Sequence, residues 1–304
     1  MAYTLVQLKQ ALMYGVAPAM ATPLQTDGYT VNTAVIPDLV EFLLDHQAKG
    51  LFIGGTTGEG ILLDVAERQR LHETAVQAVN GRVPALVHIG ANRTDTAVAL
   101  ARHAAAIGAD AIAAVTPTFY GVSDDGLAAY YHAIAAAAPD LPLLLYDIPH
   151  MAVNGISPAL LTRLSAELPL LAGVKTSQAN AQLLRPLIDA VHEEQLVMAG
   201  NERIALGALA LGAHGLISGL STAVPEPFVA LAAAFGAGDM AAAQRAHKLI
   251  NQVLDLLPAA RIGAIKLILQ ERGIAVGTAV PPRPMPQGPV WARMEPLLAA
   301  FAAS

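Results

Sequence analysis

The strongest constraint on the fold of this 304-residue chain is a repeated alternation of short apolar runs with longer amphipathic segments. A continuous apolar run is typical of a strand that is buried on both faces. Each run ends in Gly, Pro, Thr or Ser, and we predict eight strands from them, at residues 16–23, 50–55, 85–90, 111–117, 141–149, 170–177, 195–200 and 215–219.

The segments between these runs carry helix caps and apolar residues at helical spacing, for example residues 32–46, 64–79, 93–107, 124–138, 157–168 and 179–191. Strands that alternate with helices of this length imply crossover connections and a parallel sheet. Eight such units predict an α/β fold, a closed (β/α)₈ TIM barrel. An open, doubly wound sheet is the structural alternative.

The strand pattern stops beyond about Pro225. Residues 228–235, 240–257 and 261–272 are predicted helices rich in Ala and Leu, and a Pro-rich stretch at 280–289 precedes a last amphipathic segment at 290–302. We therefore expect a barrel over residues 1–225 and a C-terminal helical extension over residues 226–304, packed together as one structural unit. The apolar faces of the extension favour a homo-oligomer.

Composition excludes several classes of function. The net charge is −6 and no basic run interrupts the chain, so neither nucleic acid nor an anionic membrane is an expected partner. The absence of cysteine excludes disulfides, thiolate catalysis and cysteine-ligated metals. No signal peptide and no apolar segment long enough to span a membrane is found, so we expect a cytoplasmic globular protein.

The active site of a (β/α)₈ barrel lies at the C-terminal ends of its strands, and Lys175 lies at the end of the run 170–177. Burying an ammonium there is costly, so the lysine is either paired or has a lowered pKa. A neutral buried amine is what Schiff-base chemistry requires. The alternative interpretation is a lysine that extends to solvent from a strand end.

Two other run ends carry groups suited to the same chemistry. The sequence GGTTGEG at residues 54–60 offers backbone N–H groups and the hydroxyls of Thr56 and Thr57, which suit a carboxylate or phosphate. A plain glycine-rich turn is the alternative. Tyr146 lies just before the end of the run 141–149, where its phenol could act as acid and base. A core tyrosine with its hydroxyl at the surface is the alternative there.

The last two runs add candidates around the same barrel mouth. Glu202 and Arg203 follow the run 195–200, and Ile217 lies in a run with room for a small ligand. An anion cradle, a phenol and an amine around one mouth suit Schiff-base chemistry on a 2-oxo acid.

Three motifs in this order, GGTTGEG, YDIP and GVKTS, resemble the dihydrodipicolinate synthase and N-acetylneuraminate lyase superfamily of class I pyruvate-dependent aldolases, over about residues 16–284. The resemblance implies that Lys175 forms the Schiff base and that Tyr146 transfers protons. It also implies that Thr56 and Thr57 hold the carboxylate of a 2-oxo acid. The backbone at two further positions would line the site, at Gly200 and Ile217.

The chain departs from the family pattern at three positions. Asp147 replaces the asparagine of the YNIP pattern. Dihydrodipicolinate synthases have an arginine two residues after the proline, and Met151 occupies that position here. The relay tyrosine of the family is replaced by Phe119, although Tyr120 follows it. The changes at Met151 and Phe119 argue against a role in lysine biosynthesis.

We therefore expect an aldolase that cleaves or forms a carbon–carbon bond between pyruvate and an aldehyde, acting on a 2-oxo-3-deoxy sugar acid or a related hydroxy-2-oxo acid. The candidates for the distal end of the substrate are Glu202, Arg203, His150 and Tyr120. No metal and no cofactor is expected, because the imine supplies the electron sink. The resemblance implies a homotetramer or a homodimer.

Three other functions remain open at this point. Two keep the Schiff base: a hydro-lyase that dehydrates a 3-deoxy-2-oxo acid, and dihydrodipicolinate synthase itself. The third, from a different class, is a non-catalytic protein that binds 2-oxo acids.

Overall fold

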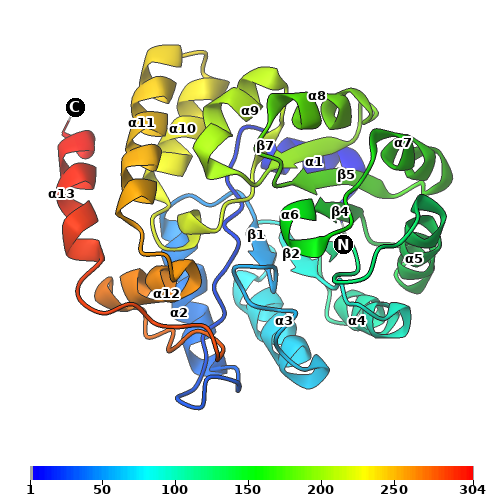
Figure 1. Ribbon diagram of the computed structural model, residues 1–304, viewed down its shortest axis with the longest axis horizontal. Helices are drawn as coiled ribbons and strands as arrows, with labels where there is room; N and C mark the ends of the chain where they lie inside the picture. The colour runs from blue at the N-terminus through cyan, green and yellow to red at the C-terminus, as the bar shows by residue number, and fades with distance from the viewer. Residues whose placement is uncertain (1–2, 304) are drawn as a thin grey trace.

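A curled sheet of parallel strands forms the centre of the computed structural model, which describes residues 3–303 (Figure 1). Seven strands pair in chain order within these residues. They are β1 (Leu51–Ile53), β2 (Ala85–His88), β3 (Ala111–Val115), β4 (Leu143–Asp147), β5 (Leu171–Thr176), β6 (Leu196–Ala199) and β7 (Gly215–Leu216). Each lies in one of the predicted runs, so the prediction of an α/β fold with a parallel sheet is confirmed.

The first predicted run, residues 16–23, is not a regular strand. It makes two isolated parallel bridges, from Val16 to Leu216 of β7 and from Ala19 to Phe52 of β1. The Phe52 N–H donates to the Pro18 carbonyl at 2.9 Å, but Pro18 itself has no N–H to give. The run therefore lies between the two edge strands of the sheet while forming only a broken ladder.

Helices surround the sheet on its outer side (Figure 1). The predicted segments correspond to α2 (Ile36–Asp45), α3 (Val65–Val79), α4 (Thr94–Ala106), α5 (Asp124–Ala137), α7 (Pro158–Glu167) and α8 (Ala181–Asp189). Side chains of Asp64, Ser123 and Ser157 cap three of them by accepting a backbone N–H of the first turn. A helix was also expected to begin at Glu202 and Arg203, and α9 (Ala205–Leu211) follows them. Two helices were not predicted: α1 (Leu5–Leu12) and α6 (Pro149–Ala152).

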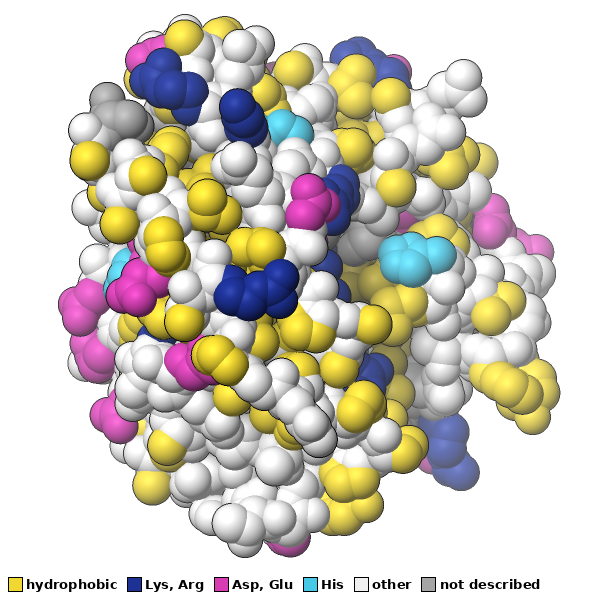
Figure 2. Space-filling view, turned by 60° about the vertical axis from the view of Figure 1, so that its left-hand side comes forward, with side chains coloured by type: hydrophobic (Ala, Val, Ile, Leu, Met, Phe, Trp, Pro, Cys, Tyr) yellow, Lys and Arg dark blue, Asp and Glu magenta, His cyan; other side chains and the backbone are white. Residues whose placement is uncertain are grey.

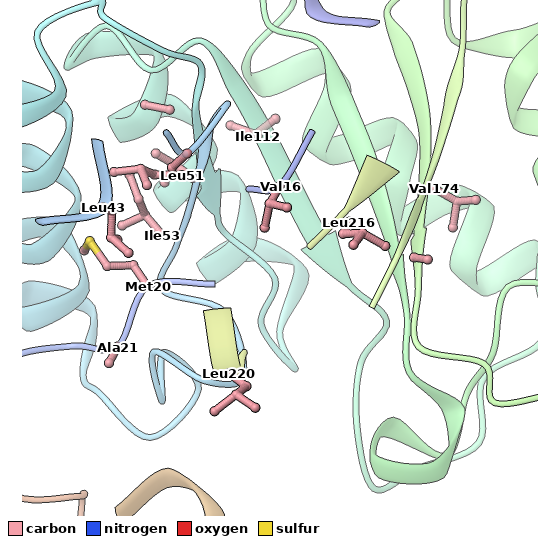
Figure 3. Packing of buried hydrophobic residues seen from close by; sticks show 14 of the residues in the cluster. Val16, Met20, Ala21, Leu43, Leu51, Ile53, Ile112, Val174, Leu216 and Leu220 are labelled. Carbon is pink, nitrogen blue, oxygen red and sulfur yellow. The ribbon is translucent and has the colours of Figure 1, made fainter. Parts of the chain in front are cut away.

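Strand side chains alternate between two buried layers. Those that point outward pack against the helices, and Figure 3 shows five of them: Leu51, Ile53, Ile112, Val174 and Leu216. Those that point inward form a separate apolar cluster, which includes Phe52, Leu86, Ala113, Leu144, Tyr146 and Met198. A polar group at an inward position close to a strand end therefore faces an apolar interior on one side and the mouth on the other.

The C-terminal part is helical, as predicted, with α10 (Glu226–Gly236), α11 (Met240–Leu256), α12 (Arg261–Glu271) and α13 (Trp291–Ala302). Helices α10 and α11 pack side by side, and α13 runs along α11 on the outside of the molecule (Figure 1). The Pro-rich residues 280–289 form neither helix nor strand. Within residues 3–303, no helix combines the length and the apolar character needed to cross a membrane.

A buried ion pair joins this C-terminal part to the loop after β1. The Nζ atom of Lys266 in α12 lies 2.8 Å from Oε2 of Glu59, and both side chains are fully buried. Lys266 also donates to the Thr278 carbonyl at 2.6 Å, and Oε1 of Glu59 accepts the Val280 N–H at 2.9 Å. Glu59 has a φ of 56°, in the left-handed region that few side chains adopt. The contacts from α12 and residues 278–280 hold it there.

We predict that Lys266→Met and Glu59→Leu each lower the free energy of unfolding by about 3–5 kcal/mol, because each leaves a buried charge without its partner. The double variant should lose much less than the sum of the two, because no lone buried charge remains. Urea unfolding of the three variants measures this.

The matched control is Arg163→Met, which removes ion pairs of a half-exposed arginine with Asp125 and Glu167 and should change stability little. A Lys266→Met variant as stable as this control would contradict the prediction.

Candidate active site

Lys175 lies on β5 and points inward because of an irregularity two residues before it. Ala172 belongs to the inward cluster and Val174 to the outward one, so the alternation is inverted between them. The pairing of β4 with β5 shifts register at this point, and Gly173 has a φ of 121°. A Cβ atom on Gly173 would lie 2.0 Å from the Leu196 carbonyl oxygen, so the position requires glycine. The glycine of the GVK motif thus directs Lys175 into the interior.

The Lys175 ammonium is enclosed by aromatic rings. Its Nζ lies 4.0 Å from the ring centroid of Phe52 and 3.9 Å from that of Tyr146, and the residue is only 3% exposed. Burial lowers the pKa of Lys175 to about 7, and the negative charge of Glu202 partly opposes this shift. Lys175 therefore does not extend to solvent, and a large fraction of it is a neutral amine near pH 7.

Tyr146 lies beside Lys175, since the two residues are partners in the β4–β5 pairing. The Tyr146 hydroxyl lies 3.0 Å from Oγ1 of Thr56. Burial raises the pKa of Tyr146 to about 12, although hydrogen bonds with Thr56 and Ser177 act in the opposite direction. The phenol is therefore protonated at neutral pH and can exchange protons along these hydroxyls.

The glycine-rich loop after β1 presents Thr56 and Thr57 to the same space. It is fixed from the inner side of the sheet by His88, whose Nδ1 lies 3.0 Å from the Gly54 carbonyl, while its Nε2 accepts the Val115 N–H at 3.3 Å. These contacts assign the proton to Nδ1. Burial holds the pKa of His88 well below its usual value, so the ring stays neutral. With Glu59 held on the other side, the loop is fixed before any ligand binds.

The groups described above open into a cavity of about 420 Å³. Figure 2 shows a face of the molecule that is hollowed, with basic, acidic and histidine side chains around the hollow. Nine of the ten predicted site residues line the cavity: Thr56, Thr57, Tyr146, His150, Lys175, Gly200, Glu202, Arg203 and Ile217. The tenth, Tyr120, lies on the surface, 75% exposed, with its ring against Phe119.

Glu202 and Arg203 line the cavity, but the charged group of each is already paired with other residues of the protein. Oε1 of Glu202 accepts hydrogen bonds from the Ser218 hydroxyl at 3.0 Å and from the N–H groups of Gly219 and Leu220 at 3.1 Å. Its Oε2 lies 2.6 Å from Nη2 of Arg261. Arg203 forms an ion pair of 2.7 Å with Asp255 of α11. Glu202 thus fixes the chain after β7.

Asp147 shows why a carboxylate is compatible with the position that is asparagine in the YNIP pattern. The residue is fully buried, and its oxygens accept hydrogen bonds from the Thr176 hydroxyl at 2.7 Å, the Gln178 side chain at 3.0 Å and the Ile156 N–H at 3.0 Å. These donors satisfy the charge. Asp147 ties the end of β4 to the end of β5, and so fixes the strands that carry Tyr146 and Lys175.

Sequence reasoning missed four residues of this region. Ser177 and His88 could have been found from the sequence, because each is a polar residue near the end of a predicted strand. Arg261 and Arg283 also line the cavity, but they belong to residues 226–304. No strand was predicted there, so no strand end indicated a site residue. In residues 3–303 no group of three or more His, Cys, Asp or Glu side chains is arranged to hold a metal ion.

Comparisons with known proteins agree with this geometry. The sequence is 34% identical over 250 residues to a 4-hydroxy-tetrahydrodipicolinate synthase of Salinibacter ruber, covering 82% of this chain and 80% of the relative. It is 32% identical over 274 residues to a probable 2-dehydro-3-deoxy-D-pentonate aldolase of Escherichia coli, covering 88% and 90% of the two chains.

Solved structures of similar proteins have the same fold. The wild-type sialic acid aldolase of Ruminococcus gnavus superposes with a TM-score of 0.91 at 25% identity, over 96% of this chain and 99% of that one. A prophage protein of the dihydrodipicolinic acid synthase family from Escherichia coli, in complex with pyruvate, gives 0.87 at 28% identity, over 95% and 99%. A model of the Dihydrodipicolinate synthetase family matches residues 12–296. The chain belongs to this family.

Proposed function

We propose that this protein is a class I aldolase that cleaves or forms a carbon–carbon bond between pyruvate and an aldehyde, with a hydroxy-2-oxo acid such as a 2-oxo-3-deoxy sugar acid as substrate. The observation that carries the proposal is the buried Lys175, with a pKa of about 7, against the ring of Tyr146 in a cavity lined by Thr56 and Thr57. Enzymes of this family are lyases that hold pyruvate as a lysine imine without a cofactor.

The reaction begins when the neutral Nζ of Lys175 attacks the C2 ketone of the substrate. Tyr146 gives its proton to the resulting hydroxyl, which leaves as water, and a protonated imine forms. The phenolate of Tyr146 then takes the proton of the C4 hydroxyl while the C3–C4 bond breaks. The electron pair of that bond moves into the imine and leaves the enamine of pyruvate, and the C4 fragment departs as an aldehyde.

The threonine cradle contributes orientation. The Oγ1 of Thr56 is within hydrogen-bond distance of the Tyr146 hydroxyl, so Thr56 links the proton-transfer group to the bound carboxylate. Thr57 packs against Gly219, where a Cβ would lie only 2.5 Å from its Oγ1. Close packing places the Thr57 hydroxyl against Gly219, and a carboxylate bound by the two threonines fixes which face of the imine meets Tyr146. Protonation of the enamine at C3 and hydrolysis of the imine release pyruvate.

The synthase reaction is a second candidate, favoured by relatives that carry this name. Met151 argues against the synthase reaction, because a half-exposed methionine lines the cavity where synthases have their arginine.

We also infer the arrangement in which this site works. The bridges at residues 16–20 support counting that run as the eighth strand of a (β/α)₈ barrel, with residues 226–304 as an extension of the same unit. The exposed rings of Phe119 and Tyr120 support a homo-oligomer in which a second copy covers them.

Incubation with pyruvate and sodium borohydride should give a stable adduct on Lys175, because reduction traps the imine. Intact mass and a peptide map measure it, and Lys175→Met should give none. A folded wild-type protein that gives no adduct would refute the proposed function.

The initial rate of trapping should rise with pH through a midpoint near 7, because only the neutral amine attacks and the pKa of Lys175 is about 7. An ordinary lysine would give a midpoint about three pH units higher. In Glu202→Gln the midpoint should fall, because the negative charge that favours the ammonium is lost. A wild-type midpoint near 10 would show that Lys175 is not desolvated in solution.

Tyr146→Phe should retain pyruvate trapping at high pyruvate but lose at least about 100-fold in turnover, since proton transfer is lost while the amine remains. Turnover is measured as pyruvate released from 2-oxo-3-deoxy sugar acids. Thr74→Ala is the control, because its hydroxyl donates to the Arg70 carbonyl on α3, outside the cavity that holds Lys175. Unchanged turnover in Tyr146→Phe would show that Tyr146 does not transfer the proton.

A further inference from the structure

Three arginines line the cavity that contains Lys175, and they differ in what they contact. Arg203 is paired with Asp255 and Arg261 with Glu202. Arg283, in the Pro-rich segment, forms no ion pair and no side-chain hydrogen bond with any residue among 3–303. Arg283 as a residue is partly buried, so where its guanidinium loses water no group of the described chain replaces it.

The positive charge of Arg283 also lies near another cation. It acts on the neighbouring Lys266, where its positive charge contributes to the lowered pKa of that lysine. The charge of Lys266 is balanced by Glu59 at 2.8 Å, so this buried pair has no net negative charge that could attract Arg283. A cavity wall with one unpaired guanidinium on a partly buried residue favours an anionic ligand.

Arg283 lies where two hollows meet, whereas Thr57 of the threonine cradle lines the main cavity alone. A second, smaller hollow of about 180 Å³ adjoins the main cavity, and four residues line both: Thr56, Ile148, Met151 and Arg283. Ile148 and Met151 are apolar, so Arg283 is the charged group of this shared wall. The proposed position of the substrate's first carboxylate is at Thr56 and Thr57, which leaves Arg283 for a different part of the molecule.

We propose that Arg283 binds a second anionic group at the far end of the substrate, so that this enzyme prefers 2-oxo acids with a distal carboxylate. The inference rests on the proposed function, because the imine at Lys175 fixes the other end of the ligand. It narrows the substrate class, and it makes Arg283, rather than the paired Arg203, the residue that determines specificity at the distal end.

Borohydride trapping tests this without knowledge of the natural aldehyde. The probes are 2-oxoglutarate, 2-oxoadipate and 2-oxopimelate, each compared with the 2-oxo acid of equal length that ends in a methyl group. Three lengths place the second carboxylate at different distances from Lys175. For at least one length, the dicarboxylic acid should reach half-maximal trapping at about 10-fold lower concentration than its partner, the usual effect of one charged hydrogen-bonded pair.

The variant Arg283→Gln should abolish this preference, measured within the variant as the ratio of half-maximal concentrations for each dicarboxylic acid and its methyl-ended partner. Arg283→Lys should retain part of the preference, because it keeps the charge but not the planar fork. Arg93→Gln, which changes an exposed arginine paired with Asp95 outside the cavity, should retain all of it.

The outcomes separate the two proposals. Failure to trap pyruvate on wild-type Lys175 refutes the proposed function. Trapping of pyruvate without a preference for any dicarboxylic acid, or a preference that survives in Arg283→Gln, refutes the role of Arg283 and leaves the aldolase proposal standing.

Discussion

The site depends on the backbone hydrogen bonds that residues 16–20 make to both edges of the sheet. They place β7 and β1 on either side of one short run, so Thr57 after β1 and Gly219 after β7 come together although the chain separates them widely. A flat parallel sheet would put these residues at opposite edges. Curvature is therefore the condition under which residues of β4 and β5 and residues that follow β1 and β7 surround a single cavity.

Within this arrangement, desolvation sets the protonation states of Lys175 and Tyr146. The inward position that Gly173 gives to Lys175 places an amine among Phe52 and Tyr146, and the loss of water lowers the pKa of the amine while it raises that of the phenol. A neutral amine and a protonated phenol are the two states that imine formation requires. Glu202 limits the shift at Lys175 by its negative charge, and Arg261 holds Glu202 in place.

The C-terminal helices contribute to the site from outside the sheet. Through Lys266 they fix Glu59, and with it the loop that presents the two threonines. Arg261 of α12, together with Arg283 of the Pro-rich segment, adds two positive charges to the cavity wall. The part of the chain that lacks any strand is thus positioned to stabilise the cradle and to select the distal end of a substrate, which separates specificity from the groups proposed to carry the chemistry.

The sequence by itself determined the seven regular strands, most helices and the residues at strand ends, because buried strands leave a local apolar pattern that ends at polar groups. It also predicted a regular strand at residues 16–23, but Pro18 interrupts the hydrogen-bond ladder there. Only the tertiary structure decided which charges are paired: Glu202 and Arg203 were candidates for the substrate, yet both are engaged by the protein. It also brought Arg283 to the cavity and left Tyr120 on the surface. Pairing and exposure depend on contacts between residues far apart in the chain, and no local pattern encodes them.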